Sequence, residues 1–307
     1  MGVPYLLGVP NLPAFVTLAF MHEIIAIIFD FDDTLAPDST SGYLDRCGVD
    51  VPRFWKEEVR PLMETGSAAE EWDPVPAYLY KMIEKSAAGE IEPITRNSLV
   101  RWGRELPLYP GVEKIFARLR EVAATVNPRV TLEFYVISSG IGEVLRNTRI
   151  AHEFKEIWAS DFAYDTMGQI KFPRKIISFT DKTRYIFHVQ KGIFGPEYVG
   201  KPFEVNRKLD PARHRVPIKQ MIMVGDGFTD IPCFSLVKQG EGIAIGVYGD
   251  PDDREKRSRA WGFIEDGRVS NLVPADYSEK SALTHSLIMA VESLANRISL
   301  SRHTYQG

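Results

Sequence analysis

Four short runs of apolar, largely β-branched residues divide the chain, and each run stops abruptly at a cluster of polar residues or glycines. The first run is Ile24–Phe29, and the others span residues 130–137, 221–224 and 242–247. Runs that are apolar throughout, rather than alternating, are typical of strands buried on both faces of a sheet. Helical spacing of apolar residues lies between them, as over residues 112–126. Strands that alternate with helices predict an α/β fold with a parallel sheet covered on both faces.

One long insertion interrupts this alternation. Residues 38–106 separate the first two strands and have helical patterning, but they are too many for a single crossover. We therefore expect residues 38–106 to form an inserted helical domain. Residues 23–37 and 107–307 then form the α/β core.

Three further segments have recognisable patterns. Residues 159–172 predict a β-hairpin with its turn near Met167-Gly168. Residues 192–217 are rich in glycine, proline and basic residues and predict a long loop. Helical periodicity returns over residues 277–298, and we expect this tail to pack on the core.

The first residues of the chain do not fit the fold. Residues 1–20 are apolar, contain no Lys or Arg and are broken by three prolines. A signal peptide has a basic start and a membrane helix has fewer interruptions, so neither class fits. We expect residues 1–22 to be an atypical leader, with Met21 as the physiological start; a short membrane-touching segment is the alternative.

Composition narrows the functional classes. The chain has 307 residues, 44% hydrophobic and 25% charged, which excludes a disordered chain, a collagen-like fibre and a helical membrane bundle. The formal net charge of −4 argues against sequence-independent binding of nucleic acid, which needs a basic surface. The two cysteines, Cys47 and Cys233, form no CxxC motif and no disulfide framework. We therefore expect a reducing, cytoplasmic location and no membrane partner.

The run Asp30-Phe31-Asp32-Asp33-Thr34 follows the first strand. On an extended segment Asp30 and Asp32 point the same way, and Asp33 points away. Neighbouring carboxylates after a buried strand repel each other and are costly unless a cation or a reaction uses them. One carboxylate is then suited to attack an electrophile, and the other to handle a proton. The alternative is a solvated acidic turn.

A second acidic motif follows the third strand. In Gly225-Asp226-Gly227-Phe228-Thr229-Asp230, the glycines allow a tight turn and Asp226 points toward the same sheet edge as Asp30. Convergent carboxylates favour a hard cation with oxygen ligands, and Mg²⁺ fits best. The alternative is an ordinary turn with Asp230 as a helix cap. Together with the first motif, in this order, the pattern is specific.

A phosphate group beside carboxylates needs hydrogen-bond donors and a cation. Ser138, Ser139 and Gly140 end the second strand, where a hydroxyl and backbone N–H groups can bind an anion. Lys182 follows a plausible helix start and is the favoured cation, with Lys175 second. An ordinary turn and solvated surface lysines are the alternatives.

Other candidates carry less. None of the six histidines forms an HExxH motif or a close pair, so no zinc site is predicted. Cys233 is expected in the core rather than as a nucleophile. A basic segment reads best as a solvated loop, although it could attract a phosphorylated substrate; its members are Arg207, Lys208, Arg213, His214 and Arg215.

Taken in order, these motifs resemble those of the haloacid dehalogenase (HAD) superfamily of hydrolases, over residues 23–275. The matching elements are Asp30–Thr34, Ser138, Lys182 and Asp226–Asp230. The resemblance implies a Rossmann-like core with a helical C1-type cap at residues 38–106. It also implies a hairpin like that of the phosphoserine-phosphatase branch. Asp33 departs from the family pattern, because many members carry glycine there.

The resemblance also implies roles for the acidic residues. The residue that matches Asp30 is the nucleophile and becomes an aspartyl phosphate. The one that matches Asp32 is the general acid and base, and its backbone carbonyl binds Mg²⁺. Asp226 matches a further Mg²⁺ ligand, and Asp230 matches a residue that supports the metal site. The resemblance also places Asp30 among the Mg²⁺ ligands.

The resemblance places Ser138, with Ser139 beside it, and Lys182 around the phosphoryl group. We therefore expect a Mg²⁺-dependent phosphatase that hydrolyses a small phosphorylated metabolite. A phosphotransferase or phosphomutase would use the same residues, and a dehalogenase would need neither the acid/base nor the metal ligand. A non-catalytic phosphate-binding scaffold is the alternative from another class.

The inserted domain is expected to act as a lid over the substrate. It leaves the core directly after the first acidic motif, so its hinge lies beside the nucleophile. Most of its aromatic residues are expected in the lid's own core, and the side chains considered for substrate contact are Trp55, Trp72, Tyr78, Arg46, Lys56 and Arg60.

Overall fold

The computed structural model describes residues 23–64, 72–249 and 267–303. The leader predicted for residues 1–22 lies outside the described residues. Within the described part of the chain, no helix is long and apolar enough to cross a membrane.

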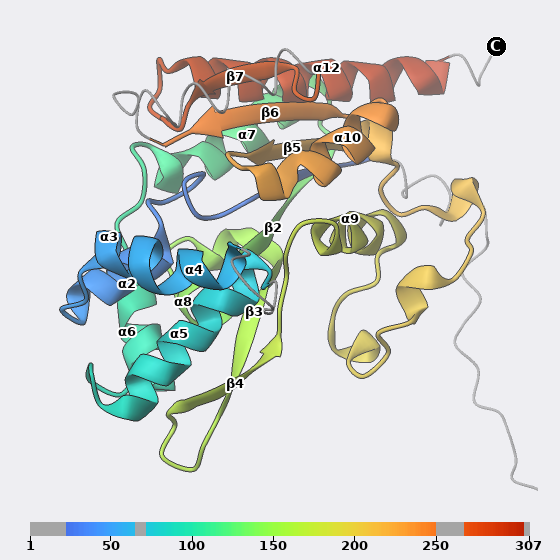
Figure 1. The fold of residues 1–307 in the computed structure, drawn as a ribbon. Coiled ribbons are helices and arrows are strands. Elements are labelled where there is room, and N and C mark those ends of the chain that lie inside the picture. The colour runs from blue at the N-terminus through green and yellow to red at the C-terminus, as the bar shows by residue number, and fades with distance from the viewer. Residues whose placement is uncertain (1–22, 65–71, 250–266, 304–307) are drawn as a thin grey trace, which may run out of the picture.

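A seven-stranded sheet forms the centre of the molecule, in the order β4-β3-β2-β1-β5-β6-β7 (Figure 1). All neighbouring strands are parallel except β3 and β4. The strands are β1 (Ile24–Phe29), β2 (Thr131–Ile141), β3 (Phe154–Tyr164), β4 (Ile170–Lys175), β5 (Met221–Gly225), β6 (Ile243–Tyr248) and β7 (Asn271–Pro274). This is the α/β architecture that the hydrophobic pattern predicts.

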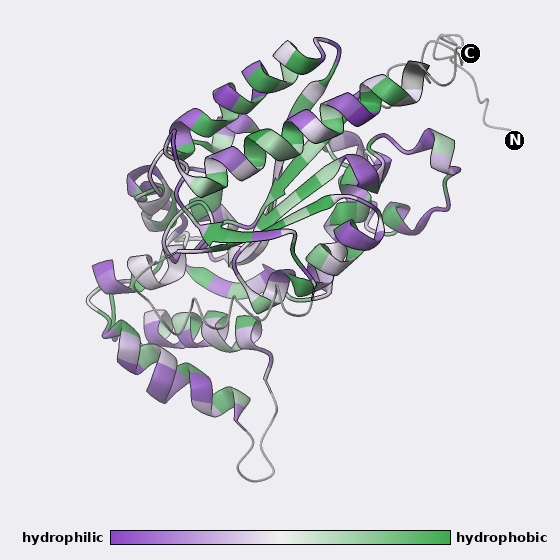
Figure 2. Cartoon of the chain, turned by 90° about the horizontal axis from the view of Figure 1, so that it is seen from above, coloured by the Kyte–Doolittle hydropathy of each residue, from purple (hydrophilic) through white to green (hydrophobic). Residues whose placement is uncertain are grey.

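Both faces of the sheet are covered, which explains why β1 is apolar throughout. Ile27 and Phe29 pack into one core with α7 (Val112–Val126) and α12 (Ala282–His303). Ala26 and Ile28 pack into a second core with α9 (Asp181–Lys191) and α10 (Ile231–Gln239). The central strands are largely hydrophobic, whereas the helices present a hydrophilic side as well (Figure 2).

The segment between β1 and α7 is helical, as predicted. It contains α2 (Ser39–Arg46), α3 (Val51–Arg53), a π-helical turn (Phe54–Val59), α4 (Arg60–Met63), α5 (Pro74–Ala88) and α6 (Arg96–Glu105). Local capping fixes the starts of two of these helices: the Asp38 carboxylate accepts from the Thr40 and Ser41 amides, and Thr95 forms a capping box with Ser98.

This helical segment is also joined to the β3–β4 hairpin. The Ile170 amide donates to the Ile94 carbonyl at 3.0 Å, and the Arg96 amide donates to the Gly168 carbonyl at 2.8 Å. The turn of the hairpin is held by Asp165, whose carboxylate accepts from the Met167 and Gln169 amides. The segment between β1 and α7 is therefore bonded both to β4, the edge strand of the sheet, and to the turn of the hairpin.

Several boundaries differ from the prediction. β3 begins at Phe154, and the apolar pattern misses this start because Lys155 and Glu156 interrupt the run. β7 has only four residues and ends in a proline, which makes it too short to detect by pattern. α12 starts at Ala282 rather than at Tyr277, whose buried hydroxyl instead donates to the Thr34 carbonyl at 3.0 Å.

Phe116 is central to the larger core, and its replacement tests that role. Its ring contacts those of Phe134, Phe154 and Phe29 at centroid distances of 5.1, 5.3 and 6.2 Å. We expect Phe116→Ala to lower the free energy of unfolding by about 3–5 kcal/mol in a urea titration. Phe172→Ala is the matched control, because that ring is 66% exposed and its loss should cost less than about 0.5 kcal/mol.

Candidate active site

Three carboxylates meet where β1 and β5 end. One oxygen from each of Asp30, Asp226 and Asp230 lies within 4.8 Å of the others. Asp30 follows β1 directly, and its amide donates to the Val224 carbonyl of β5 at 2.9 Å. Because β1 and β5 are parallel neighbours, their carboxyl ends bring the two acidic motifs to one edge.

A single buried lysine lies among these acids. The Lys182 side chain is fully buried, and its Nζ lies 3.0 Å from Asp30 Oδ2 and 2.8 Å from Asp230 Oδ1. It also donates to the Thr229 hydroxyl at 3.0 Å. Lys182 reaches this position from the first turn of α9, as the sequence analysis predicts, although Thr180 forms no side-chain cap there. Lys175 is not part of this cluster.

The cluster holds more acid than one lysine neutralises. Burial, followed by the charges of Asp30 and Asp230, raises the pKa of Asp226 well above its usual range. Burial and the Asp30 charge also raise the pKa of Asp230 to about 7, and Lys182 only partly opposes this. A divalent cation would offset the excess negative charge, and three carboxylates are the hard oxygen donors that Mg²⁺ prefers. The donor set therefore fits the metal that the sequence predicts.

Asp32 lies beside this cluster in a different environment. Its Oδ1 accepts from the Ser39 amide at 2.8 Å. Burial is the main cause that raises the pKa of Asp32 to about 8, with Asp38 adding to it. A side chain at Gly140 would clash with Asp32 Oδ2, so the strand-end loop of β2 can approach this carboxyl only because residue 140 is glycine. A carboxyl that stays protonated near neutral pH can donate a proton.

The two predicted phosphate-binding serines lie in an irregular end of β2. The strand runs to Ile141, past the predicted end, and its register with β3 shifts between Ile137 and Ile141. Ser138 is buried, and its hydroxyl accepts from the Gly140 amide at 2.9 Å. The buried Ser139 hydroxyl has no partner among the described residues. Such bulges turn side chains and backbone toward a site at the strand end.

The structure gives a physical reason for Asp33. Its φ is +52°, in the left-handed region that glycine adopts most readily and that Asp tolerates better than most residues. Its carboxylate accepts from the Tyr109 hydroxyl at 3.3 Å. Asp33 thus occupies a glycine-like backbone position, and its carboxylate is bonded to Tyr109.

Some contacts at this edge carried no signal in the sequence. Ser39 and Thr229 contribute through hydrogen bonds, and Gly140 contributes through the space it leaves. Such roles depend on tertiary neighbours, so only the position of Gly140 after two strand-end serines could have drawn attention. Tyr78, named only as one aromatic among several, donates its hydroxyl to the Ser139 carbonyl at 2.8 Å.

Other predicted contributors lie elsewhere. Arg46 and Arg60 pair with Glu105 and Glu64 at the surface. The basic segment is predicted to be a solvated loop. Arg215 departs from that prediction, because it forms an ion pair with the largely buried Glu133 at 2.5 Å. Cys233 is buried in the core as expected, and burial raises the pKa of its thiol.

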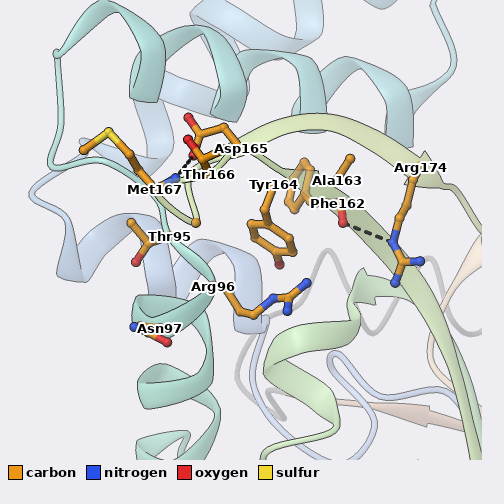
Figure 3. A pocket seen from close by; sticks show the side chains of 11 residues that line it. Thr95, Arg96, Asn97, Phe162, Ala163, Tyr164, Asp165, Thr166, Met167 and Arg174 are labelled. Atoms are coloured by element: carbon orange, nitrogen blue, oxygen red, sulfur yellow. Dashed lines mark hydrogen bonds between the residues drawn. The ribbon is translucent and has the colours of Figure 1, made fainter.

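A separate pocket of about 510 Å³ lies between the start of α6 and the β3–β4 hairpin (Figure 3). Arg96 lies over the Tyr164 ring at 4.5 Å, and Arg174 closes the other end, where its Nε donates to the Phe162 carbonyl. This pocket contains none of the predicted catalytic or metal-binding residues.

The raised pKa values predict how stability depends on pH. Between pH 3.8, the usual carboxyl pKa, and about 7 for Asp230 or 8 for Asp32, the folded chain binds more protons than the unfolded chain. Without a divalent cation, these groups should therefore make the free energy of unfolding fall as pH rises through this interval. Urea titrations in EDTA near pH 5 and near pH 8 measure the fall.

Added Mg²⁺ should restore stability most at the higher pH, where the carboxylates are ionised. Asp226→Asn is the informative variant, because it removes one charge and should flatten the pH dependence in EDTA. If the free energy of unfolding of the metal-free protein instead rises between pH 5 and pH 8, and rises equally in Asp226→Asn, this electrostatic description is contradicted.

No protein-family model matches the chain. An uncharacterized protein of Borreliella burgdorferi is 25% identical over 282 residues, which is 85% of this chain and 94% of that protein. A HAD family hydrolase of Salmonella enterica serovar Typhi has a TM-score of 0.54 at 11% identity, over 88% of this chain and 71% of that chain. A phosphoserine phosphatase, solved as an analogue of its phospho-aspartyl intermediate, has a TM-score of 0.49 at 15% identity, over 86% and 98%. The chain has the fold of the HAD family hydrolases, as its motifs predict.

Proposed function

We propose that the protein is a Mg²⁺-dependent phosphatase that hydrolyses a small phosphate monoester through an aspartyl-phosphate intermediate. The observation that carries the proposal is the contact of Asp30 with the buried Lys182, beside Asp226 and Asp230. This combination supplies a nucleophile, a cation for phosphoryl oxygens and carboxylates for a metal. The HAD fold supports the same assignment.

Each chemical step has a residue to perform it. The Asp30 Oδ atom attacks phosphorus, and the bond to the ester oxygen breaks as Asp32 donates its proton to that oxygen. Asp32, now a carboxylate, takes a proton from water as the water oxygen attacks phosphorus. The bond between phosphorus and the Asp30 oxygen breaks, which releases inorganic phosphate and regenerates the Asp30 carboxylate. Lys182 offsets negative charge on the phosphoryl oxygens throughout.

The Ser138–Gly140 segment is the proposed phosphate cradle, with Ser138 and Ser139 as ligands. Its backbone bends at the register shift of β2, and the Ser139 hydroxyl is free to donate to an oxygen of the substrate. Asp30, Asp226 and the Asp32 carbonyl would hold Mg²⁺, with Asp230 in support. When bound, Mg²⁺ would neutralise charge at the transferring phosphoryl group.

We further propose that α2–α6 form a cap that encloses a small metabolite. The Tyr78 hydroxyl of α5 contacts the Ser139 carbonyl at 2.8 Å, so the helical segment meets the catalytic edge directly. Closure over this edge would exclude water from the phosphoryl group. A phosphorylated residue on a folded protein would fit poorly beneath such a cap. Both cysteines are free, and we therefore still expect a cytoplasmic location.

Replacing the proposed nucleophile tests the proposal directly. We expect Mg²⁺-dependent hydrolysis of an aryl phosphate, and Asp30→Asn should reduce kcat by about 10³-fold or more, because an amide does not attack phosphorus. Asp33→Asn is the matched control: it removes a neighbouring acid that points to Tyr109, and it should keep most of the activity. Activity without any divalent cation, or equal activity in both variants, would refute the assignment.

Asp32→Asn tests the proton-transfer role. Loss of a general acid and base should slow turnover by about 10²–10⁴-fold for an alkyl phosphate, whose leaving oxygen needs a proton. The loss should be clearly smaller for an aryl phosphate with a good leaving group. Steady-state kinetics on the two substrates make the comparison, and an equal loss on both would rule out Asp32 as the acid.

A further inference from the structure

A group of basic side chains lies next to the proposed active site, on the side of the β3–β4 hairpin. We call Arg146, Arg174, Lys175 and Arg184 the basic cluster. Its nearness to the catalytic edge follows from two glycines at the end of β2. A side chain at Gly140 would clash with the Asp32 carboxylate, and one at Gly142 would clash with Arg146 and Asp161. Two residues of extended chain span at most about 7 Å, so the cluster starts close to Asp32.

The arginines of the cluster have acidic partners. Arg146 pairs with Asp161, and Arg174 lies 3.8 Å from the same carboxylate. Arg184 pairs with Asp181 at 3.2 Å. Arg146 also lies 3.5 Å from Glu143, so each arginine of the cluster has at least one acidic partner.

Lys175 is different, because it forms no ion pair with any described residue. It is only partly exposed at the end of β4, and its Nζ lies over the Tyr185 ring at 5.3 Å from the centroid. Burial, assisted by Arg146 and Arg184 and opposed by Asp161 and Glu156, lowers the pKa of Lys175. A cation held on an aromatic face among other cations is suited to receive an anion.

Arg184 adds a second donor without an acceptor. Its guanidinium lies over the same Tyr185 ring at 4.8 Å, and its NH2 donates to the Tyr185 hydroxyl at 2.6 Å. Its Nε is buried and has no hydrogen-bond partner among the described residues. Buried donors normally have partners, so an unsatisfied N–H beside an unpaired lysine indicates where a ligand oxygen would bind.

The position of these two donors relates them to the phosphate site. Arg184 lies in the same first turns of α9 as Lys182, which contacts Asp30. Lys175 lies on β4, three strands from β1 in the sheet order. With a strand spacing of about 4.8 Å, the backbones are about 14 Å or more apart across the sheet.

We propose that Lys175 and Arg184 bind a second acidic group of the substrate, a carboxylate or a second phosphate, at a fixed distance from the phosphate that is hydrolysed. This inference rests on the proposed phosphatase function and names its substrate class: phosphate monoesters with a distal anionic group. Lys175 provides the compact charge, and the Arg184 Nε–H provides a directed hydrogen bond. Both side chains contact the Tyr185 ring.

The experiment compares substrates that differ only in the distal group. Phosphate monoesters of linear alcohols of increasing length are prepared with a neutral, a carboxylate or a phosphate terminus, and KM and kcat are measured with Mg²⁺. The wild-type protein should prefer the doubly anionic compounds by about 10-fold or more in kcat/KM, mainly through KM, with an optimum length. A preference without any length optimum would contradict a site at a fixed distance.

Lys175→Gln should abolish this preference and leave kinetics on an aryl phosphate unchanged. Lys171→Gln is the matched control, because Lys171 is an exposed lysine of the same strand. The proposal is wrong if the preference survives in Lys175→Gln or is lost equally in Lys171→Gln. The proposal is also wrong if free malonate or sulfate raises turnover of the aryl phosphate in the wild type but not in Lys175→Gln. In that case Lys175 would belong to a site for a separate effector and not to the substrate site.

A binding measurement separates this inference from the proposed function. Calorimetry with a non-hydrolysable linear bisphosphonate of the optimum length should give about 10-fold weaker binding to Lys175→Gln than to the wild type and Lys171→Gln. Absence of aryl phosphate hydrolysis would refute the phosphatase, whereas equal bisphosphonate binding by all three proteins would refute the second anion site.

Discussion

The contact between Lys182 and two buried carboxylates is the interaction on which the rest of the site depends. Lys182 bridges Asp30 and Asp230, and all three side chains are almost completely excluded from solvent. Removing the lysine would leave uncompensated buried charge, which is among the costliest defects in a folded protein. The lysine is still outnumbered by the acids around it, so a divalent cation would balance the charge of the cluster, as the proposed function requires.

The sheet order makes this contact possible between residues far apart in the sequence. β1 and β5 are neighbours and deliver Asp30 and Asp226 to one edge, while β2 lies on the other side of β1 and delivers the strand-end serines. α9 covers the face next to them and places Lys182 at the edge from its first turn. Arg184 lies two residues later in the same helix, so α9 contributes to both the proposed phosphate site and the proposed second anion site.

The sequence predicts the sheet, the helical insertion and the acidic residues and lysine at the ends of β1 and β5, because each depends on a local pattern. β1 is apolar on both faces, and the acidic motifs follow strands directly. The same reasoning could not find β7, which is too short, or the true extent of β2, whose last residues form a bulge around Ser138. It also missed the tie between Ile94 and the hairpin and the ion pair of Arg215 with Glu133, because those contacts join distant segments without a sequence signal.

The central claim is that Asp30 becomes phosphorylated during turnover, and trapping that intermediate tests it most directly. The protein is mixed with an aryl phosphate and Mg²⁺, quenched in acid and examined by intact-mass and peptide mass spectrometry. The account predicts one added phosphoryl group, located on the peptide that contains Asp30, and its accumulation when Asp32→Asn slows its hydrolysis. Phosphate release without a phosphorylated peptide, or a phosphoryl group on another residue, would contradict it.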